Sequence, residues 1–294
     1  MAWRGVHLSE AARLSLKDNA LLIDRGDEGV RVPIEDIAFI VVDSPEITLP
    51  TTVLSALGMA NVALVITDAK HLPCATLLPV GYHHRHSAIA DLQRLTTKSL
   101  EGNLWKLVVA RKILNQAWVL KSVGKDDTPL LAMASRVKPG DPDNIEARAA
   151  REYWSRLFVD FRRRDNNDAR NMALNYGYAV MRSVVARACV AHGLTTAFGI
   201  KHANMANPFN LADDLMECFR PIVDLAVQSL ALSTGLEKLD KETRQSLVAL
   251  QMRDVHIGGT VTGIVPASDV LVSSFIRALT DKSSKELLLP ELIE

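Results

Sequence analysis

A change of hydrophobic pattern near residue 82 most constrains what this chain can fold into. Before this point, short apolar runs are separated by glycine- and proline-containing breaks, whereas from about residue 88 the apolar positions follow helical spacing. The first pattern indicates short strands, and the second indicates amphipathic helices. We therefore expect an α+β protein, with a small β-rich domain over 1–82, a linker over 83–90 and a larger all-α domain over 91–294.

The apolar runs also predict individual elements. In the β-rich part, strands are expected over 20–24, 30–32, 37–42, 62–67 and 74–78, with one short helix over 51–60 that covers a sheet face. The second part is expected to begin with a long helix pair, followed by helices over 169–191, from about 211 onward, over 241–252 and over 267–279. Pro221 removes a helical hydrogen bond, so the helix from 211 is expected to kink or restart there.

Composition excludes several kinds of protein. The 294 residues carry 34 Lys plus Arg and 34 Asp plus Glu, so a nucleic-acid surface must be a local patch rather than the whole protein. The three cysteines are far apart and show no spacing typical of a zinc site or redox pair. Because no stretch approaches the roughly 18 apolar residues of a membrane span, we expect a cytoplasmic protein without a membrane partner.

Glu146 has an unusual position in its predicted helix. The preceding loop, 138–144, ends with Asp143 and Asn144, either of which is expected to cap that helix. On a helical wheel Glu146 lies on the same face as a series of apolar side chains, and a carboxylate there must be paired, protonated or bound to a cation. The alternative is a first-turn glutamate that interacts with the helix dipole or a neighbouring arginine.

A second acidic group lies in the segment 207–221. Asp214 and Glu217 are three residues apart and can share one helix face. A solvated polar face is the ordinary explanation for such a stripe. His202 precedes it in a segment of loop-like composition, where a histidine is usually a surface residue. Two carboxylates with one imidazole would instead form a ligand set that suits Mg²⁺ or Mn²⁺, and hence phosphodiester chemistry.

Four segments in a fixed order resemble the Cas1 family, the integrase and nuclease subunit of CRISPR adaptation. They begin with Asn144-Ile-Glu-Ala-Arg, Asp168-Ala-Arg-Asn-Met, Gly199-Ile-Lys-His and Asn207-Pro-Phe-Asn-Leu. The β-rich start and helical remainder extend the resemblance over essentially the whole chain, and the motif spacing is similar to that of the shorter members that accompany type II systems. The resemblance implies that Glu146, His202 and Glu217 are catalytic metal ligands, with Asp214 as an additional candidate.

The resemblance also implies the reaction and the partners. The 3′-hydroxyl of a captured double-stranded DNA fragment would attack a phosphodiester at the boundary of a CRISPR repeat, in a transesterification that depends on Mg²⁺ or Mn²⁺. Family members act as homodimers, two of which flank a dimer of the small companion subunit Cas2 in a heterohexamer. In this sequence, the small apolar β-rich domain is the expected dimerisation surface.

Basic side chains near the motifs are candidate DNA contacts. Arg162, Arg163 and Arg164 run together after the helix of Glu146, and Lys201 stands where family members commonly have a second histidine. The alternative is a solvated charged surface. Asn175 and Tyr178 are expected beside the metal but are interpreted as packing residues. The histidines at 83, 84 and 86 are interpreted as a polar linker that touches DNA or a dimer partner, and no metal is assigned to them.

Two other functions remain open at this level. A nuclease that cuts branched DNA in repair would use the same metal ligands with water as the nucleophile. A non-catalytic DNA-binding scaffold would use the acidic side chains only as a solvated face. Blocking the 3′ end of the DNA distinguishes the first alternative, and replacing Glu146 by alanine distinguishes the second.

Overall fold

The computed structural model describes residues 2–26, 29–79, 83–165 and 167–293. Its first part contains two four-stranded sheets, ordered β1-β5-β7-β8 and β4-β3-β2-β6. Within the first sheet, β1, β5 and β7 are parallel and β8 is antiparallel to β7. The elements are β1 (Arg4–Leu8), β2 (Ala12–Lys17), β3 (Ala20–Asp24), β4 (Gly29–Pro33), the 3₁₀ turn η1 (Ile34–Asp36), β5 (Ile37–Val42), β6 (Ile47–Thr48), α1 (Thr51–Met59), β7 (Ala63–Thr67) and β8 (Pro73–Leu77).

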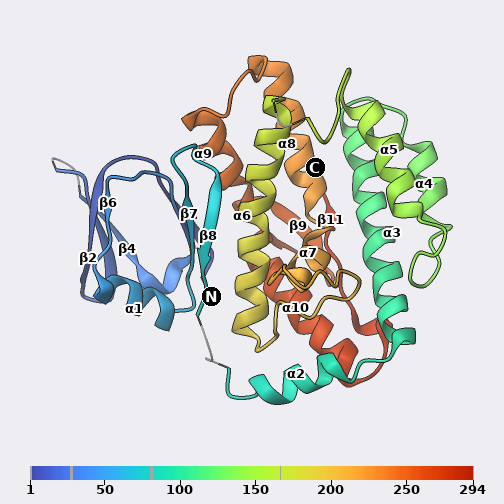
Figure 1. Ribbon diagram of the computed structural model, residues 1–294, viewed down its shortest axis with the longest axis horizontal. Coiled ribbons are helices and arrows are strands. Elements are labelled where there is room, and N and C mark those ends of the chain that lie inside the picture. Colours follow the sequence, from blue (N-terminus) through green and yellow to red (C-terminus); the bar gives the residue numbers. More distant parts are fainter. Residues whose placement is uncertain (1, 27–28, 80–82, 166, 294) are drawn as a thin grey trace.

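Strand β5 joins the two halves of the molecule. All six of its residues are buried, because helices cover one face of its sheet and the second sheet covers the other. Phe39 and Val41 belong to the large core that includes the helices, whereas Ile40 and Val42 belong to the core of the β-rich part. A strand buried on both faces explains the uninterrupted apolar run in the sequence. Figure 1 shows this sheet facing helix α6 (Ala169–Ala191), which contacts β5, β7 and β8.

The second part is mostly helical, as expected. Long helix α6 lies beside the β-rich part, and α3 lies toward the opposite side of the helical part (Figure 1). The helices are α2 (His86–Arg94), α3 (Lys98–Ser122), α4 (Thr128–Ala134), α5 (Ile145–Leu157), α6, α7 (Asn210–Met216), α8 (Arg220–Thr234), α9 (Lys241–Ala249) and α10 (Ile264–Thr280), with 3₁₀ turns η2 (Leu250–Met252) and η3 (Ser284–Glu286). The predicted restart at Pro221 is confirmed, because α8 begins at Arg220 with this proline in its first turn.

Two differences from the sequence-based expectation concern the helical part. Helix α2 begins at His86, inside the segment 83–90 that was predicted to be a linker. The helical part also contains a small antiparallel sheet, ordered β10-β9-β11, made of Asp254–Ile257, Thr260–Gly263 and Glu291–Leu292. A part expected to be all-α is therefore mostly helical with one small sheet. Gly258 and Gly259, both with positive φ, form the two-residue turn between β9 and β10. This glycine pair was the sequence signal for the hairpin.

A buried ion cluster ties the β-rich part to the helical part. Asp43, which follows β5, is fully buried and accepts hydrogen bonds from Arg244 Nε of α9 (2.7 Å) and Thr67 Oγ1 (3.1 Å). Its carboxylate also lies 2.9 Å from Nε2 of His7 and 2.9 Å from Nδ1 of His71. Burial opposes ionisation of Asp43, but these partners outweigh it and lower the pKa to about 2. The cluster therefore fixes β1, β5 and α9 relative to one another.

Among the described residues, no helix combines the length and apolar character that crossing a membrane requires.

Candidate active site

Glu146 lies in the first turn of α5, and a carboxylate from the preceding loop fixes the start of this helix. Asp141 accepts hydrogen bonds from the backbone N–H groups of Ile145 (2.8 Å) and Glu146 (3.0 Å). Asn144 occupies the N-cap position with φ of 50° but makes no side-chain cap bond. The expectation that Asp143 or Asn144 caps the helix was therefore wrong, because the chain turns through a left-handed residue that brings Asp141 beneath the helix end.

Glu217 lies in the short joint between α7 and α8 and is almost completely buried, with 4% of its surface exposed. Its Oε1 accepts a hydrogen bond from Arg220 (2.7 Å), one turn later. Burial opposes ionisation of this carboxyl, but the charges of Arg220 and Lys112 outweigh it and bring the pKa to about 2. Glu217 is therefore an ionised carboxylate in a buried position, where a cation must compensate it.

Lys112 of α3 compensates Glu217 together with Arg220, and it also reaches Glu146. Its Nζ donates to Glu146 Oε1 at 2.7 Å and lies 2.6 Å from Glu217 Oε2. Only 10% of the lysine side chain is exposed. Burial works against the ammonium, but the two carboxylates outweigh it and raise the pKa of Lys112. The structure thus brings two of the three predicted ligands, Glu146 and Glu217, together around one positive charge.

His202 lies beside these carboxylates at the start of an exposed loop. Its Nδ1 hydrogen-bonds to Oδ1 of Asp214, which is fully buried, and its ring makes an edge contact with Trp105 at 5.9 Å. The hydrogen bond to Asp214 raises the pKa of His202, with further contributions from the charges of Glu217 and Glu146. Since Nδ1 is engaged, Nε2 is the ring nitrogen that remains for a ligand.

Asp214 organises the backbone of the same loop. Its Oδ2 accepts from the N–H groups of Ile200 (2.6 Å) and Lys201 (2.8 Å), and the N–H of His202 lies 3.3 Å from the same oxygen. At Gly199, a Cβ would lie 2.8 Å from Asp214 Oδ2 and 2.3 Å from the carbonyl oxygen of His202. The Gly-Ile-Lys-His motif therefore requires glycine at its first position, because the side chain of any other residue would clash with Asp214 and with the backbone of His202.

Replacing Asp214 by asparagine is expected to lower the pKa of His202. The substitution removes the negative partner of Nδ1, which is the main cause of the raised value. The imidazolium would consequently lose its proton at a lower pH than in the wild-type protein. An NMR titration of the histidine ring resonances in the metal-free protein measures this change directly. An unchanged His202 titration would contradict the assigned hydrogen bond.

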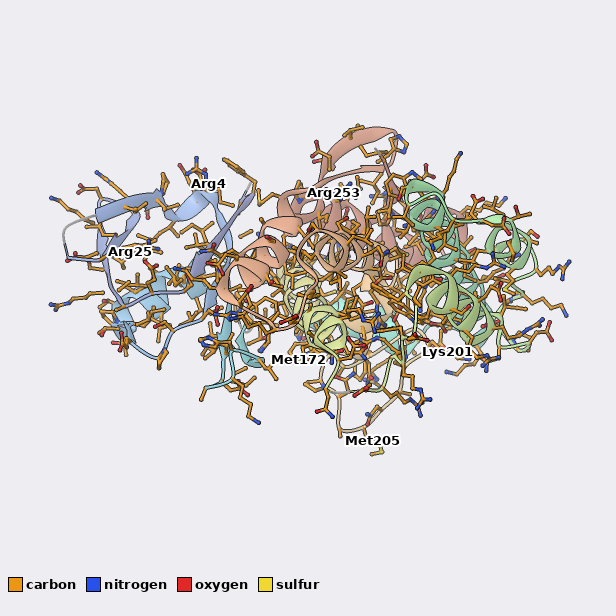
Figure 2. The ribbon with its side chains drawn as sticks, turned by 90° about the horizontal axis from the view of Figure 1, so that it is seen from above. Arg4, Arg25, Met172, Lys201, Met205 and Arg253 are labelled. Carbon is orange, nitrogen blue, oxygen red and sulfur yellow. The ribbon has the colours of Figure 1, made fainter. Side chains whose placement is uncertain are left out.

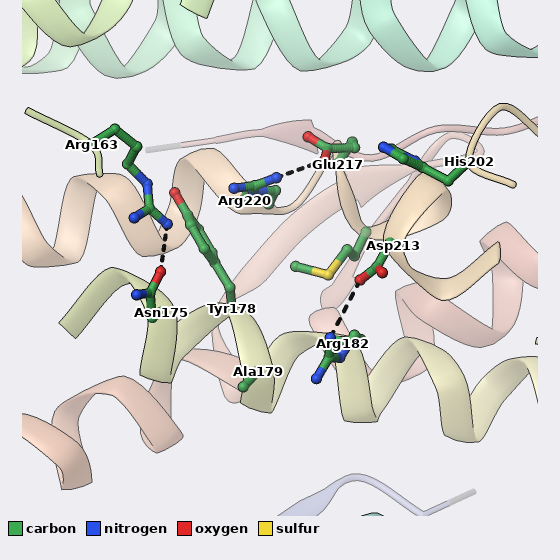
Figure 3. Close-up of a pocket in the computed structure, with 10 residues that line it drawn as sticks. Arg163, Asn175, Tyr178, Ala179, Arg182, His202, Asp213, Glu217 and Arg220 are labelled. Carbon is green, nitrogen blue, oxygen red and sulfur yellow. Dashed lines mark hydrogen bonds and ion pairs between the residues drawn. The ribbon is translucent and has the colours of Figure 1, made fainter. Parts of the chain in front are cut away.

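A pocket of about 380 Å³ opens next to these residues. Figure 3 shows Glu217 and His202 on one side of it and α6 on the other. Its lining is rich in arginine and comprises Arg163, Asn175, Tyr178, Ala179, Arg182, His202, Asp213, Met216, Glu217 and Arg220. The guanidinium of Arg220 stacks on the Tyr178 ring at 4.1 Å, and that of Arg163 lies 5.4 Å from the same ring. The pocket therefore combines acidic side chains at one end with positive charge around the rest.

Beneath the pocket, Asp224 of α8 accepts hydrogen bonds from Tyr153 (3.0 Å) and from Tyr178. Burial raises the pKa of Asp224 to about 6. The amide of Asn175 accepts a hydrogen bond from Arg163 at 2.7 Å. Tyr178 is buried, in agreement with its interpretation as a packing residue, whereas Asn175 is exposed in the pocket lining and its interpretation as a packing residue was wrong.

The predicted DNA contacts differ in their surroundings. Arg163 lines the pocket and donates to Asn171 (3.0 Å) and Asn175, whereas Arg162 and Arg164 are exposed. The Lys201 ammonium donates to the carbonyl of Gly140 at 3.0 Å, close to the loop that begins α5. Figure 2 shows Lys201 and, farther along the same loop, Met205 on one side of the molecule.

The histidines at 83, 84 and 86 do not act as one group. The rings of His83 and His84 stack at 4.9 Å, while His86 Nδ1 lies 3.0 Å from the carbonyl oxygen of Gly193. Tyr82, which directly precedes these histidines in the sequence, lies outside the described residues. This segment is distant in the chain from the carboxylate site and packs near the end of α6.

Across the described ranges, no three histidine, cysteine or acidic side chains already form a metal-binding cluster. The donor set nevertheless fits a divalent cation. Glu217 Oε2 is buried and receives no aligned hydrogen bond from the described part of the chain, although the Lys112 ammonium touches it. The lysine thus stands in for a cation between two carboxylates, with His202 adjacent.

Sequence reasoning missed Lys112 and Asp141. Lys112 is four residues after buried Val108 and four before buried Gln116, so it lies on the buried face of α3. A lysine on such a face requires a negative partner, and this was the available signal. Asp141 gave no comparable signal, because Asp143 and Asn144 are closer to the helix start.

Comparisons with known proteins show what this chain is similar to. Residues 6–256 match the family model described as CRISPR associated protein Cas1. The chain is 38% identical to CRISPR-associated endonuclease Cas1 of Neisseria meningitidis serogroup C (strain 8013), over 100% of this chain and 97% of the relative. It is 30% identical to CRISPR-associated endonuclease Cas1 1 of Pyrobaculum aerophilum, over 80% of this chain and 85% of the relative.

Solved structures share the fold. A CAS1 protein from Thermotoga maritima superposes with a TM-score of 0.75 at 18% identity, covering 94% of this chain and 97% of that one. A casposase bound to integration product gives a TM-score of 0.78 at 22% identity, covering 95% and 91%. A chain of a Cas6-RT-Cas1–Cas2 complex gives 0.76 at 15% identity, covering 99% of this chain and 36% of that longer one. The agreement extends through both the β-rich and the helical parts.

Proposed function

Because the chain belongs to the Cas1 family of CRISPR-associated proteins, we propose that it is a metal-dependent DNA endonuclease and integrase of CRISPR adaptation, acting in the cytoplasm. It inserts short DNA fragments, the spacers, into a CRISPR array. One observation supports the location of the proposed active site. Glu146 and Glu217 enclose a single cation position beside His202, at the end of an arginine-lined pocket.

We assign the metal to Glu146, His202 and Glu217. When bound, Mg²⁺ or Mn²⁺ polarises the scissile phosphate and favours ionisation of the attacking hydroxyl. His202 would bind through Nε2, since Asp214 holds its Nδ1. Asp214, which the sequence suggested as an additional ligand, is better placed to orient His202, because both of its oxygens already accept hydrogen bonds.

The reaction exchanges one phosphodiester for another. The 3′-hydroxyl oxygen of the captured fragment forms a bond to phosphorus, and the bond to the 3′ oxygen of the repeat strand breaks. The attacking hydroxyl loses its proton, and the departing oxygen gains one. Arg163 and Arg182 line the pocket and are placed to meet phosphate oxygens, while Arg220 holds Glu217.

The path of the flanking DNA is proposed to follow exposed basic residues next to the pocket. Arg162 and Arg164 are exposed on the loop before α6, and Lys201 lies on the loop of His202. Contacts of this kind hold the duplex by its phosphates and do not read its sequence. They would bind the double-stranded fragment and the CRISPR repeat alike.

The partners follow from the family. We propose a homodimer joined through the β-rich part, over 1–82, with residues 91–294 as the catalytic part and two dimers flanking a Cas2 dimer. The fold of the chain matches that of a chain in a Cas6-RT-Cas1–Cas2 complex, which supports Cas2 as the companion. The similarity to the Neisseria relative is compatible with a type II system.

A donor with a blocked 3′ end tests the proposed reaction. With Cas2, Mn²⁺ and a repeat-containing plasmid, a labelled duplex with free 3′-hydroxyls should be joined to the plasmid, whereas a dideoxy-terminated duplex should not. A repair nuclease that uses water would cut its DNA regardless of the donor end. Joining of the blocked duplex, or metal-dependent cutting without any joining, would contradict the proposal.

A further inference from the structure

The position of Lys112 is more specific than charge balance alone requires. Its ammonium is contacted by carboxylates from α5 and from the joint between α7 and α8, while the lysine itself comes from α3. The three segments are far apart in the sequence, and 90% of the lysine side chain is shielded from solvent. A flexible surface lysine would instead remain hydrated. This lysine is therefore part of the built site.

Each oxygen of Glu217 already has a cationic partner while Lys112 is in place. Its Oε1 is bound to Arg220, and its Oε2 is in contact with the ammonium. Arg220 is fixed from a second side, because its guanidinium stacks on Tyr178. Lys112 has contacts with the two glutamates and a long unbranched side chain, so it is the partner that can leave.

A divalent cation and the ammonium cannot share the two carboxylates. A cation such as Mg²⁺, bound to the same oxygens at about 2.0–2.1 Å, would lie within a few ångströms of Nζ. Two unit positive charges at such a separation already repel at the effective dielectric of a protein site, and a doubly charged ion repels more. Simultaneous occupancy is therefore strongly disfavoured.

We propose that Lys112 is a resident counter-ion of the catalytic carboxylates, which a divalent cation must displace in order to bind. This inference rests on the proposed metal-dependent function. Without metal, the ammonium holds Glu146 and Glu217 together and offsets their mutual repulsion. With metal, the ammonium leaves and the cation takes over the same two carboxylates. Lys112 is thus a positioning residue that preassembles the site and sets the metal affinity.

Mn²⁺ binding to the full-length Lys112→Met protein tests the exchange. Methionine keeps much of the apolar stem and removes the charge, so we expect Mn²⁺ to bind at least about tenfold more tightly than to wild type by isothermal titration calorimetry, as a competing cation is lost. In EDTA the variant should melt below wild type, because two carboxylates lose their partner, and saturating Mn²⁺ should close this gap. Lys112→Arg, which keeps the charge, should show no tightening.

Two controls keep the outcomes separate. Lys112→Gln repeats the measurement with a neutral side chain that can still donate to a carboxylate, in case the methionine variant folds poorly. Glu146→Gln should weaken Mn²⁺ binding in both the wild-type and Lys112→Met backgrounds. Binding that depends on Glu146 but is unchanged or weaker in both neutral variants would overturn the exchange alone. Binding that is absent, or indifferent to Glu146, would overturn the metal site itself and the exchange with it.

Discussion

Replacement of Glu217 by glutamine is expected to reduce strand transfer by about 10³-fold or more. The carboxylate is buried, ionised and proposed to bind the metal, and a bound metal supplies several kcal/mol of transition-state stabilisation. At about 1.4 kcal/mol per factor of ten, the loss of such a ligand corresponds to roughly three orders of magnitude. The measurement is the initial rate of labelled-duplex incorporation with Cas2 and Mn²⁺.

Glu152→Gln is the matched control for Glu217→Gln. Glu152 is on α5 but points away from the site and pairs with Arg156 at 2.5 Å on the surface. Its replacement should leave incorporation within about twofold of wild type, because exposed ion pairs contribute little. Circular dichroism and a melting curve establish that Glu217→Gln is folded under the assay conditions. A folded Glu217→Gln protein with a wild-type rate would contradict the assignment.

Asp43→Asn is expected to lower the free energy of unfolding by about 3–5 kcal/mol at neutral pH. The substitution leaves the guanidinium of Arg244, which is 6% exposed, without its carboxylate in a buried position. The folded-state pKa of Asp43, about 2, is below its ordinary value of 3.8, so its contribution is present above about pH 4 and is lost as the pH falls toward 2. The difference between variant and wild type should therefore shrink in acid.

Urea unfolding at pH 7 and near pH 3 measures this effect. Asp18→Asn is the control on the same part of the chain, because Asp18 is a surface residue whose pair with Arg31 is exposed on both sides. Its replacement should change the free energy of unfolding by less than about 0.5 kcal/mol. An Asp43→Asn protein as stable as the control at pH 7 would show that the cluster does not join the two parts of the molecule.

Much of the fold was predictable because several elements are dictated by local patterns. Strands β3 and β5 and helix α6 coincide with their predicted ranges, since each is an uninterrupted apolar or periodic run. Strand β1 was missed because it mixes arginine, glycine and histidine, and it is specified by pairing with β5 rather than by its own composition. Strand β2 was also missed, although its alternation of buried and exposed residues, with Ala12 and Leu14 buried, is a pattern that indicates a strand.

The site was predictable only in part, for a related reason. The helical wheel correctly put Glu146 on the face of α5 that carries buried Ala149, Tyr153 and Leu157. What compensates its charge could not be read locally, because Lys112 is 34 residues away on another helix. The pairing of His202 with Asp214 likewise depends on how a loop wraps a buried carboxylate, which spacing alone does not determine.

Anomalous diffraction from crystals grown with Mn²⁺ tests the central claim most directly, because it locates the metal without reference to activity. Our account predicts one strong manganese peak within coordination distance of Glu146, His202 Nε2 and Glu217, with the Lys112 ammonium withdrawn from the two carboxylates. Manganese bound elsewhere, or a site that stays empty at saturating Mn²⁺ with Lys112 still between Glu146 and Glu217, would contradict it.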